Sequence, residues 1–277
     1  MQPFDLHQPH PRTVPVLFDS PHSGRHYPPD FGSSAALSDL RRAEDAYVDQ
    51  LLLDAVPLGV TLLLATCPRC YLDLNREADD IDLGMIEGSW PGAVSPTEKS
   101  KRGLGLIRRL VAPGVPVYDR RLSVEEVQRR IDAVHVPYHA ALWDLRTQLL
   151  EHHDTLWHVN WHSMKSVGNA MTPDGAGAAR PDFVLGDLHG RSADPAVTRF
   201  AVEILEGMGY SVAVNDPYAG GKIVREMGDP RGRVHSIQIE MNRALYLDEA
   251  RVEKTQGFER LKVDLTTFSS TFADGVR

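Results

Sequence analysis

The chain has 277 residues, of which 42% are hydrophobic and 25% charged, and its formal net charge is −8. This length and composition are those of one large globular domain or two small ones. The negative charge argues against nucleic acid or an anionic membrane as a partner, although local arginines can still bind small anions. No apolar run is long enough to span a bilayer and the N-terminus lacks a signal-peptide pattern, so we expect a cytoplasmic protein.

The N-terminal part predicts an arm, a strand and a turn. Residues 1–13 are rich in Pro and His and are expected to form a loose arm ahead of a single domain over residues 14–277. Val14–Asp19 is typical of a short buried strand, and the SPHSG turn that follows presents His22. A histidine in such a turn is either an ordinary surface residue or a functional group delivered to the sheet edge.

A helix and a second strand come next. Apolar residues at helical spacing predict a helix from an N-cap at Ser38 to about Leu58, where Pro-Leu-Gly ends it. Glu44 and Asp45 lie on or beside its apolar stripe, and acidic residues of a helix usually form a solvated face. Val60–Thr66 is nearly continuous in apolar residues and predicts a buried strand.

Two polar features follow this strand. Cys67 and Cys70 form a single CxxC, which is a weak zinc signal, and two strand-end thiols are the favoured interpretation. The alternation in YLDLNR predicts an extended segment with Asp73 and Asn75 on one face and Arg76 at its exit. An Arg beside an Asn suits a carboxylate anchor, because the guanidinium offers two parallel charge-assisted bonds and the amide adds another. The alternative is a structural pair between Arg76 and a nearby aspartate.

The middle of the chain predicts a long loop and a long helix. Ile86–Pro116 is rich in Gly and Pro, contains the basic run KSKRGLGLIRR, and is expected to cross the sheet edge as a loop. Ser123 and Glu126 form a capping box, and the helix that it opens should continue to about His153. Pro137 is expected to kink or split this helix.

The stretch TLWHVNWHSMKS, residues 155–166, predicts a central strand. His158, Asn160 and His162 lie on one face, and the other face is aromatic and β-branched, as is suitable for packing against helices. The strand ends in His-Ser and runs into a loop containing Gly, which is how open α/β sheets present catalytic groups at their carboxyl edge. The alternative is that these histidines are ordinary polar residues of a strand end.

A second polar strand is predicted over VHSIQIEMN, residues 234–242. Its apolar residues face one way, and Glu240 faces the other way. A carboxylate on a short buried strand is costly unless it is paired or has a task, so we assign Glu240 a chemical role. Strands and helices alternate throughout, which predicts an α/β domain with a parallel or mixed sheet. The other elements expected in this half are a strand within Pro181–Asp187, a helix over Asp194–Met208, a strand over Tyr210–Val214 and helical structure over Asp248–Val276.

Taken together, these groups predict metal-assisted hydrolysis. Two histidines and one carboxylate with an open position are the ligand set of a catalytic zinc, and His22, His162 and an acid of the first helix supply it. A further glutamate can take a proton from water and pass it to a leaving amine. An arginine opposite the metal would hold a carboxylate, so the predicted substrate is a small amide derived from an amino acid.

The motifs that carry this chemistry also resemble those of a known family. In chain order, PHSGRHYPPDF, the ED–VD helix, DLNR, WHSMKS, PDFVLGD, NDPYAGGKIVREMG and IQIEMNRALYLDE resemble the N-formylglutamate amidohydrolases, or N-formylglutamate deformylases. The resemblance runs from about Val14 to the final helix, and DLNR and IQIE are its most specific parts. More distantly, the order of motifs is similar to that of zinc carboxypeptidases and aspartoacylase-like deacylases. The resemblance implies a three-layer, phosphorylase/hydrolase-like α/β fold with a central mixed sheet flanked by helices.

Carried over to this sequence, the resemblance implies one catalytic zinc per chain. His22 and His162 would be ligands, and the third ligand would be Asp45, with Glu44 as the alternative because the two acids are adjacent. Glu240 would be the general base and acid.

The resemblance also implies a substrate and the residues that bind it. Asn75 and Arg76 would bind the α-carboxylate, and Arg225, just after the Gly-Gly turn, is the candidate for a second carboxylate. The implied reaction cleaves N-formyl-L-glutamate to formate and L-glutamate, as in histidine degradation. The alternatives are a related metallo-deacylase that acts on another N-acyl amino acid, and a non-catalytic, ligand-binding member of the fold.

Two departures from the family pattern concern the surroundings of the site. Asn160-Trp161 stands where the family more often has Asp-Ala, which changes what His162 contacts. The basic loop Lys99–Arg109 and the Gly-rich stretch after the central strand are not closely matched. Both are expected near the pocket and would influence acyl and amino-acid specificity.

Overall fold

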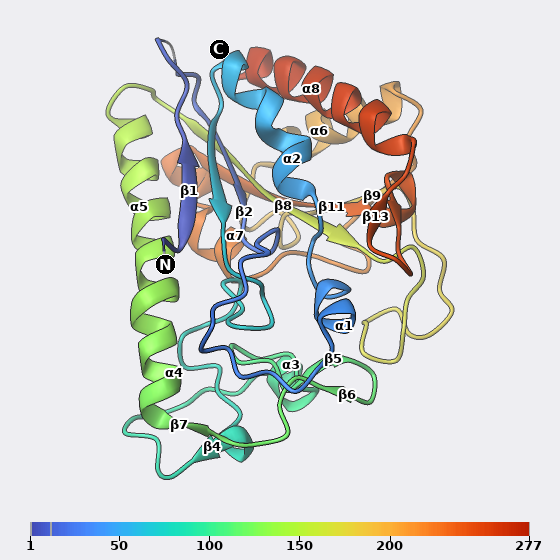
Figure 1. The fold of residues 1–277 in the computed structure, drawn as a ribbon. Helices are drawn as coiled ribbons and strands as arrows, with labels where there is room; N and C mark the ends of the chain where they lie inside the picture. Colours follow the sequence, from blue (N-terminus) through green and yellow to red (C-terminus); the bar gives the residue numbers. More distant parts are fainter. Residues whose placement is uncertain (1, 12, 277) are drawn as a thin grey trace.

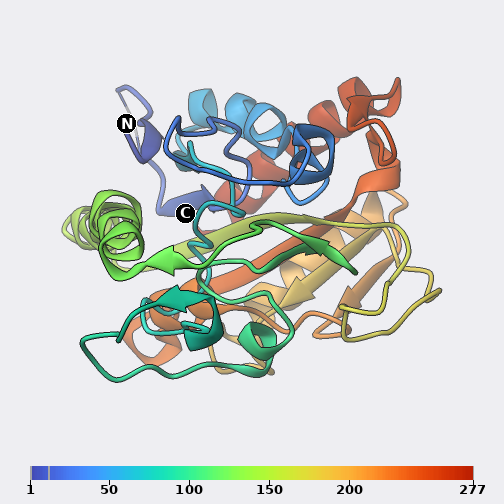
Figure 2. The ribbon, with the colours of Figure 1, turned by 60° about the horizontal axis from the view of Figure 1, so that its bottom comes forward.

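The computed structural model describes residues 2–11 and 13–276. A seven-stranded mixed sheet lies between two layers of helices, with α2 (Val48–Leu52) and α8 (Gly257–Gly275) on one face and α7 (Lys222–Met227) on the other (Figures 1 and 2). This confirms the three-layer α/β fold predicted from the sequence. The strand order is β1 (Phe4–His7), β3 (Thr61–Ala65), β2 (Val16–Ser20), β8 (Leu156–Met164), β11 (Val234–Asn242), β9 (Phe183–Gly186), β10 (Val212–Val214).

The direction of the strands brings distant residues to one edge. β3, β2, β8 and β11 are parallel to one another, whereas β1 and β9 run antiparallel to their inner neighbours. The carboxyl ends of the four parallel strands therefore meet at the same edge. The register of β8 and β11 sets Glu240 directly beside His162, and His22 follows the end of β2 at the same edge.

Alternation along the central strands divides the core into two layers. Trp161 of β8 and Ile239 of β11 face the apolar layer that contains α2, α6 and α8, as predicted. The opposite layer packs on α4, α5, α7 and the loops before them.

The remaining α-helices and strands are α1 (Leu37–Arg41), α3 (Glu98–Lys101), α4 (Val124–Arg130), α5 (Val136–Leu150), α6 (Pro195–Gly207), and the short strands β4 (Ile86–Glu87), β5 (Leu110–Ala112), β6 (Val115–Pro116), β7 (Leu122–Ser123), β12 (Leu247–Asp248), β13 (Glu253–Lys254). None of the described helices is long and apolar enough to cross a bilayer.

The prediction that residues 1–13 form a loose arm is wrong for Phe4–His7. These residues form β1 and pair with the outer edge of β3, with Phe4 opposite Ala65. The outer backbone N–H and C=O groups of β3 need hydrogen-bond partners, and β1 supplies them. The ring of Phe4 also packs edge-on against Tyr138, with 6.3 Å between the ring centroids. The first residues therefore extend the sheet by one strand.

The helix predicted from Ser38 to Leu58 is interrupted. α1 ends at Arg41, and α2 starts only after Tyr47, whose φ of 64° is left-handed. The interruption has a local cause, because the backbone N–H of Asp45 donates to the carbonyl of His22 at 2.9 Å. This bond ties the segment to the loop after β2. The acid in the break faces the sheet edge rather than solvent.

Two further predictions concern the segments that flank the long loop. The stretch YLDLNR forms turns instead of an extended strand, and the N–H of Asp73 donates to the carbonyl of Leu106 at 2.8 Å. The helix start is confirmed, because Ser123 Oγ accepts from the N–H of Glu126 at 3.1 Å. The expected irregularity at Pro137 is a π-helical segment, Ile131–His135, between α4 and α5.

Candidate active site

Three buried side chains converge at the sheet edge. His22 Nδ1 lies 3.0 Å from His162 Nδ1, and Asp45 Oδ2 lies 2.9 Å from the His162 nitrogen and 3.5 Å from the His22 nitrogen. Within the described part of the chain, these residues form the group of His, Cys, Asp or Glu side chains whose ligand atoms lie within 4.8 Å of one another. Two imidazole nitrogens and one carboxylate oxygen are the donor set that a catalytic zinc uses, so the residues fit the metal implied by the sequence.

The outer nitrogens of both histidines have acceptors. His22 Nε2 donates to Asp73 Oδ1 at 2.7 Å, and His162 Nε2 donates to Asn160 Oδ1 at 2.7 Å. A proton held on Nε2 leaves the lone pair on Nδ1, which is the tautomer that a metal at Nδ1 requires. The two outer bonds therefore prepare both inner nitrogens for the same ion.

Asp45 is held as a carboxylate. Burial alone would raise its pKa, but the close contacts with His162 and His22 and the positive charge of the nearby Arg69 hold the pKa well below its usual range. Arg243 adds a bond from Nη2 to Asp45 Oδ1 at 3.1 Å. An ionised carboxylate with fixed orientation is what a metal ligand needs.

The structure separates the two adjacent acids. Glu44 accepts a hydrogen bond from Tyr27 Oη at 2.5 Å, and Arg41 lies 3.8 Å from its other oxygen. It is not part of the converging group, whereas Asp45 is. Of the two adjacent acids that the sequence offered as the third ligand, Asp45 is therefore the one with the geometry of a metal ligand.

Glu240 lies next to the converging group without being part of it. Its backbone pairs with that of His162 across the two central strands, and Gln238 Nε2 donates to its Oε1 at 3.0 Å. Burial raises the pKa of Glu240. A buried carboxyl group with a raised pKa beside a metal site is suited to accept and return a proton.

His22, His162 and Glu240 line a cavity of about 460 Å³. Its lining contains nine Lys and Arg side chains but only two carboxylates, Glu98 and Glu240, although the whole chain carries a net charge of −8. The concentration of positive charge in one cavity favours an anionic ligand.

Asn75 and Arg76 lie at this cavity, as predicted. Arg76 Nε donates to the carbonyl of Leu104 at 2.8 Å and Nη1 donates to the carbonyl of Asn75 at 2.7 Å, which fixes the guanidinium and leaves Nη2 without a partner among the described residues. The amide of Asn75 lies against the turn before α7, where a Cβ on Gly221 would come within 2.5 Å of it. Only glycine allows this close approach.

Arg225 is not brought to the cavity. It lies on α7, it is 56% exposed, and its guanidinium pairs with Glu77. The sequence places Arg225 correctly after the Gly-Gly turn, but the helix that starts there turns the side chain away from the pocket. Its predicted role as the second carboxylate site therefore has no support from the structure.

Sequence reasoning missed several residues that line the cavity. Arg69 donates to Asp73 Oδ2 at 3.0 Å and lies 3.7 Å from Asp45, and Arg243 follows directly after β11. Lys99 and Arg108 come from the basic loop, which was expected near the pocket, although neither residue was given a role. Arg243 could have been predicted from the sequence, because it directly follows the polar strand. Arg69 could not, because its contacts depend on how the turn around it folds.

Cys67 and Cys70 are buried free thiols, and burial raises their pKa values to about 12 and about 11. Neither belongs to the converging group of the described residues. This agrees with the interpretation of two strand-end thiols. The backbone of Cys67 has a packing role, because a Cβ on Gly24 would lie 2.2 Å from its carbonyl oxygen.

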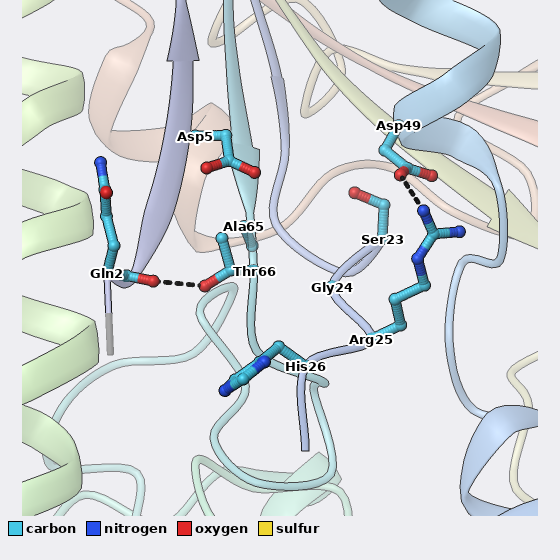
Figure 3. A pocket seen from close by; sticks show the side chains of 9 residues that line it. All are labelled: Gln2, Asp5, Ser23, Gly24, Arg25, His26, Asp49, Ala65 and Thr66. Carbon is cyan, nitrogen blue, oxygen red and sulfur yellow. Dashed lines mark hydrogen bonds and ion pairs between the residues drawn. The ribbon is translucent and has the colours of Figure 1, made fainter. Parts of the chain in front are cut away.

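A second hollow, of about 380 Å³, lies beyond the loop that follows His22 (Figure 3). It is lined by the residues after that histidine and by the edge of β1 and β3. Arg25 reaches across it to within 3.5 Å of Asp49, and Thr66 Oγ1 donates to the carbonyl of Gln2 at 2.6 Å. The converging group does not line it, so it is separate from the candidate active site.

Comparisons with known proteins agree with the geometry. The family model of N-formylglutamate amidohydrolase matches residues 14–247. The chain belongs to the N-formylglutamate amidohydrolase family. It is 30% identical to an N-formylglutamate deformylase of Pseudomonas putida over 247 residues, which is 87% of this chain and 84% of that protein. It is 31% identical to the deformylase of Pseudomonas aeruginosa over 244 residues, covering 85% and 83%.

One solved structure leads to the same family, and a second shares the fold. The crystal structure of N-formylglutamate amidohydrolase from Ralstonia eutropha JMP134 has a TM-score of 0.93 and 40% identity, over 100% of this chain and 99% of that one. The gene product Atu2144 of Agrobacterium tumefaciens shares the fold, with a TM-score of 0.65 and 15% identity, over 100% of this chain and 96% of that chain. The chain is thus an amidohydrolase of the class that acts on linear amides.

Proposed function

We propose that this protein is a zinc-dependent hydrolase that cleaves N-formyl-L-glutamate to formate and L-glutamate. The observation that carries the proposal is the convergence of His22, Asp45 and His162 beside Glu240, at a cavity whose charged lining residues are mostly cations. The names of the relatives support the substrate, and the charge of the cavity suits a molecule with two carboxylates. Residues 14–277 would act as one catalytic domain, in the cytoplasm and as a step of histidine degradation.

The metal ligands, Glu240 and Arg69 would have separate roles in the reaction. His22, Asp45 and His162 would hold one zinc, which when bound supplies a Lewis acid that activates water and polarises an acyl carbonyl. Glu240 would take a proton from the attacking water and return it to the nitrogen of the departing amine. Arg69, which lies close to Asp45, is placed to donate to the oxygen that becomes negative as the carbonyl is attacked.

Binding would orient the substrate before the reaction. Asn75 and Arg76 would hold the α-carboxylate, because both are buried at the cavity and Arg76 is already fixed through Leu104. Holding one carboxylate at this point limits where the amide can lie, which is the main benefit of a charged anchor in a hydrolase. The carbonyl group would then face the metal ligands.

The test is formate release from N-formyl-L-glutamate by purified protein of measured zinc content. We expect release that stops on treatment with a chelator and returns when zinc is added. Bound zinc without formate release, together with hydrolysis of N-acetyl-L-glutamate, would favour the related metallo-deacylase. Formate release that survives complete removal of metal would contradict the proposed role of the ligand group.

A further inference from the structure

The cations of the cavity differ in whether they already have partners. Arg243 bonds to Asp45 and to backbone carbonyls, and Arg180 forms a two-point pair with Asp174 at 2.8 Å for each bond. Arg69 is bonded to Asp73. These three arginines are built into the walls. They cannot offer a full guanidinium to a ligand without breaking existing bonds.

Lys99 is in a different situation. Its ammonium makes no hydrogen bond or ion pair with any described residue, although it lines the cavity. The nearest acid in the sequence, Glu98, is bonded to Lys101 at 2.6 Å instead. The positive charge of the nearby Arg76 lowers the pKa of Lys99 to about 8. An ammonium held near a guanidinium and without a carboxylate is a repulsive arrangement that an anion would relieve.

The position of Lys99 is fixed by its surroundings. It lies on α3, whose N-cap Thr97 is bonded through its N–H and its hydroxyl to the two oxygens of the buried Asp80, at 2.7 and 3.0 Å. Past the other end of α3, the N–H of Leu104 donates to the carbonyl of Lys99 at 2.8 Å, and the carbonyl of Leu104 accepts from Arg76 Nε. The backbone of Leu104 therefore connects Lys99 and Arg76, the two cations of this wall.

Depth in the cavity separates the roles of these cations. Asn75 and Arg76 are buried, and the amide of Asn75 lies 3.3 Å from the ring of His162. Lys99 is exposed on α3. In an N-acyl glutamate, the α-carboxylate is attached to the carbon next to the amide, whereas the side-chain carboxylate is two methylene groups farther away. The inner pair thus suits the α-carboxylate and the outer ammonium suits the remote one.

We propose that Lys99 binds the side-chain carboxylate of the substrate and determines the preference for an acidic amino acid. This inference rests on the proposed function, and it assigns to the basic loop the role that the sequence had given to Arg225. Arg108 would support the same subsite, because its Nε donates to Asp73 at 3.4 Å and its outer donors have no side-chain partner among the described residues.

The experiment compares N-formyl-L-glutamate with N-formyl-L-glutamine, which has the same shape without the side-chain charge. For Lys99→Met, we expect kcat/KM for the glutamate substrate to fall by about 10- to 100-fold, which corresponds to one charge-assisted hydrogen bond. The value for the glutamine substrate should stay within about twofold. Lys101→Met is the matched control, since Lys101 is on the same helix but outside the cavity lining, and it should keep the full preference.

Two outcomes would overturn the inference. An equal loss on both substrates would mean that Lys99 serves the α-carboxylate or the fold, and an unchanged preference would mean that it binds neither carboxylate. Lys165→Met tests the opposite wall, and loss of preference there alone would move the subsite to that residue.

Failure of the proposed function would look different. In that case wild-type protein would release no formate from either compound. The subsite is then tested by binding of glutarate against its monoamide to the zinc-loaded protein. Tighter binding of glutarate to wild type, lost in Lys99→Met, would support the anion subsite, and equal binding of the two ligands to wild type would refute it.

Discussion

Replacement of Asn160 by Leu should weaken zinc binding without disrupting the ligands themselves. In the structure, Asn160 Oδ1 accepts the Nε2 proton of His162 at 2.7 Å, and its Nδ2 donates to Asp19 Oδ1 at 2.8 Å. Without Asn160, the proton of His162 has a better partner on the inner side, where Asp45 Oδ2 lies 2.9 Å from Nδ1. A proton at that nitrogen competes directly with a metal ion.

The size of the effect follows from the lost bond. Asn160 and His162 are both buried, so an Nε2 proton left without an acceptor costs about 1–3 kcal/mol. Loss of such an outer contact of a metal-binding histidine typically reduces metal affinity by about 10- to 100-fold. We therefore expect the zinc dissociation constant of Asn160→Leu, measured by competition with a chelator of known affinity, to rise by about that factor.

Tyr138→Phe provides the control. The hydroxyl of Tyr138 donates to Asp19 Oδ2 at 2.8 Å, on the side of the carboxylate that does not face Asn160. Its removal should lower the free energy of unfolding by about 1 kcal/mol, as measured by urea titration, and leave zinc affinity unchanged. If folded Asn160→Leu binds zinc as tightly as wild type, the argument that the outer bond selects the tautomer is refuted.

Three other predictions address the remaining parts of the site. Glu240→Gln should keep its zinc, measured by elemental analysis, and lose about 10²- to 10⁴-fold in kcat, and full activity would show that Glu240 moves no proton. Arg225→Ala should leave KM for N-formyl-L-glutamate within about twofold, because an exposed ion pair with Glu77 contributes little and lies outside the cavity; a large rise in KM would return Arg225 to the site. Because the pKa of Lys99 is lowered to about 8, its positive charge is present below that pH and lost above it, so kcat/KM for N-formyl-L-glutamate should fall as the pH rises through about 8. N-formyl-L-glutamine should show no such fall, and Lys99→Met should abolish it.

The parts of the site that the sequence revealed are those governed by short periodic patterns. Alternation along β8 and β11 was sufficient to place His162 and Glu240 on the same polar face, and their pairing then depends on two strands being neighbours. His22 was identifiable because its turn directly follows a buried strand. These residues obtain their positions from backbone geometry that extends over only a few residues.

Asp45 could not be positioned in this way. Helical periodicity around it is genuine, but the bond from its N–H to the carbonyl of His22 and the contacts of Arg243 interrupt the helix. Both partners are far away in the sequence, and no local pattern encodes them. The same reason applies to Arg225, whose direction is set by the helix that begins at Lys222 and by Glu77.

The distribution of charge within the cavity explains how one pocket could hold both a cation and an anion. The carboxylates of Asp45, Asp73 and Glu240 are buried at the end with the two histidines, and the ammonium of Lys99, which has no partner in the part of the chain that the structure describes, lies at the outer wall. Asp73 connects the two regions, because one of its oxygens accepts from His22 and the other accepts from Arg69.

A divalent ion would be stabilised at the acidic end, and it would be repelled by the cationic wall. A substrate with two carboxylates experiences the opposite forces, so its charged groups are drawn to the wall and its uncharged amide is left for the metal end. This polarity would orient an acidic N-acyl amino acid even before any specific hydrogen bond forms. An N-acyl amino acid with a neutral side chain lacks the second carboxylate, so its kcat/KM should be lower than that of an acidic substrate. This difference should become small at high ionic strength, because screening weakens the attraction of the exposed Lys99 for the side-chain carboxylate.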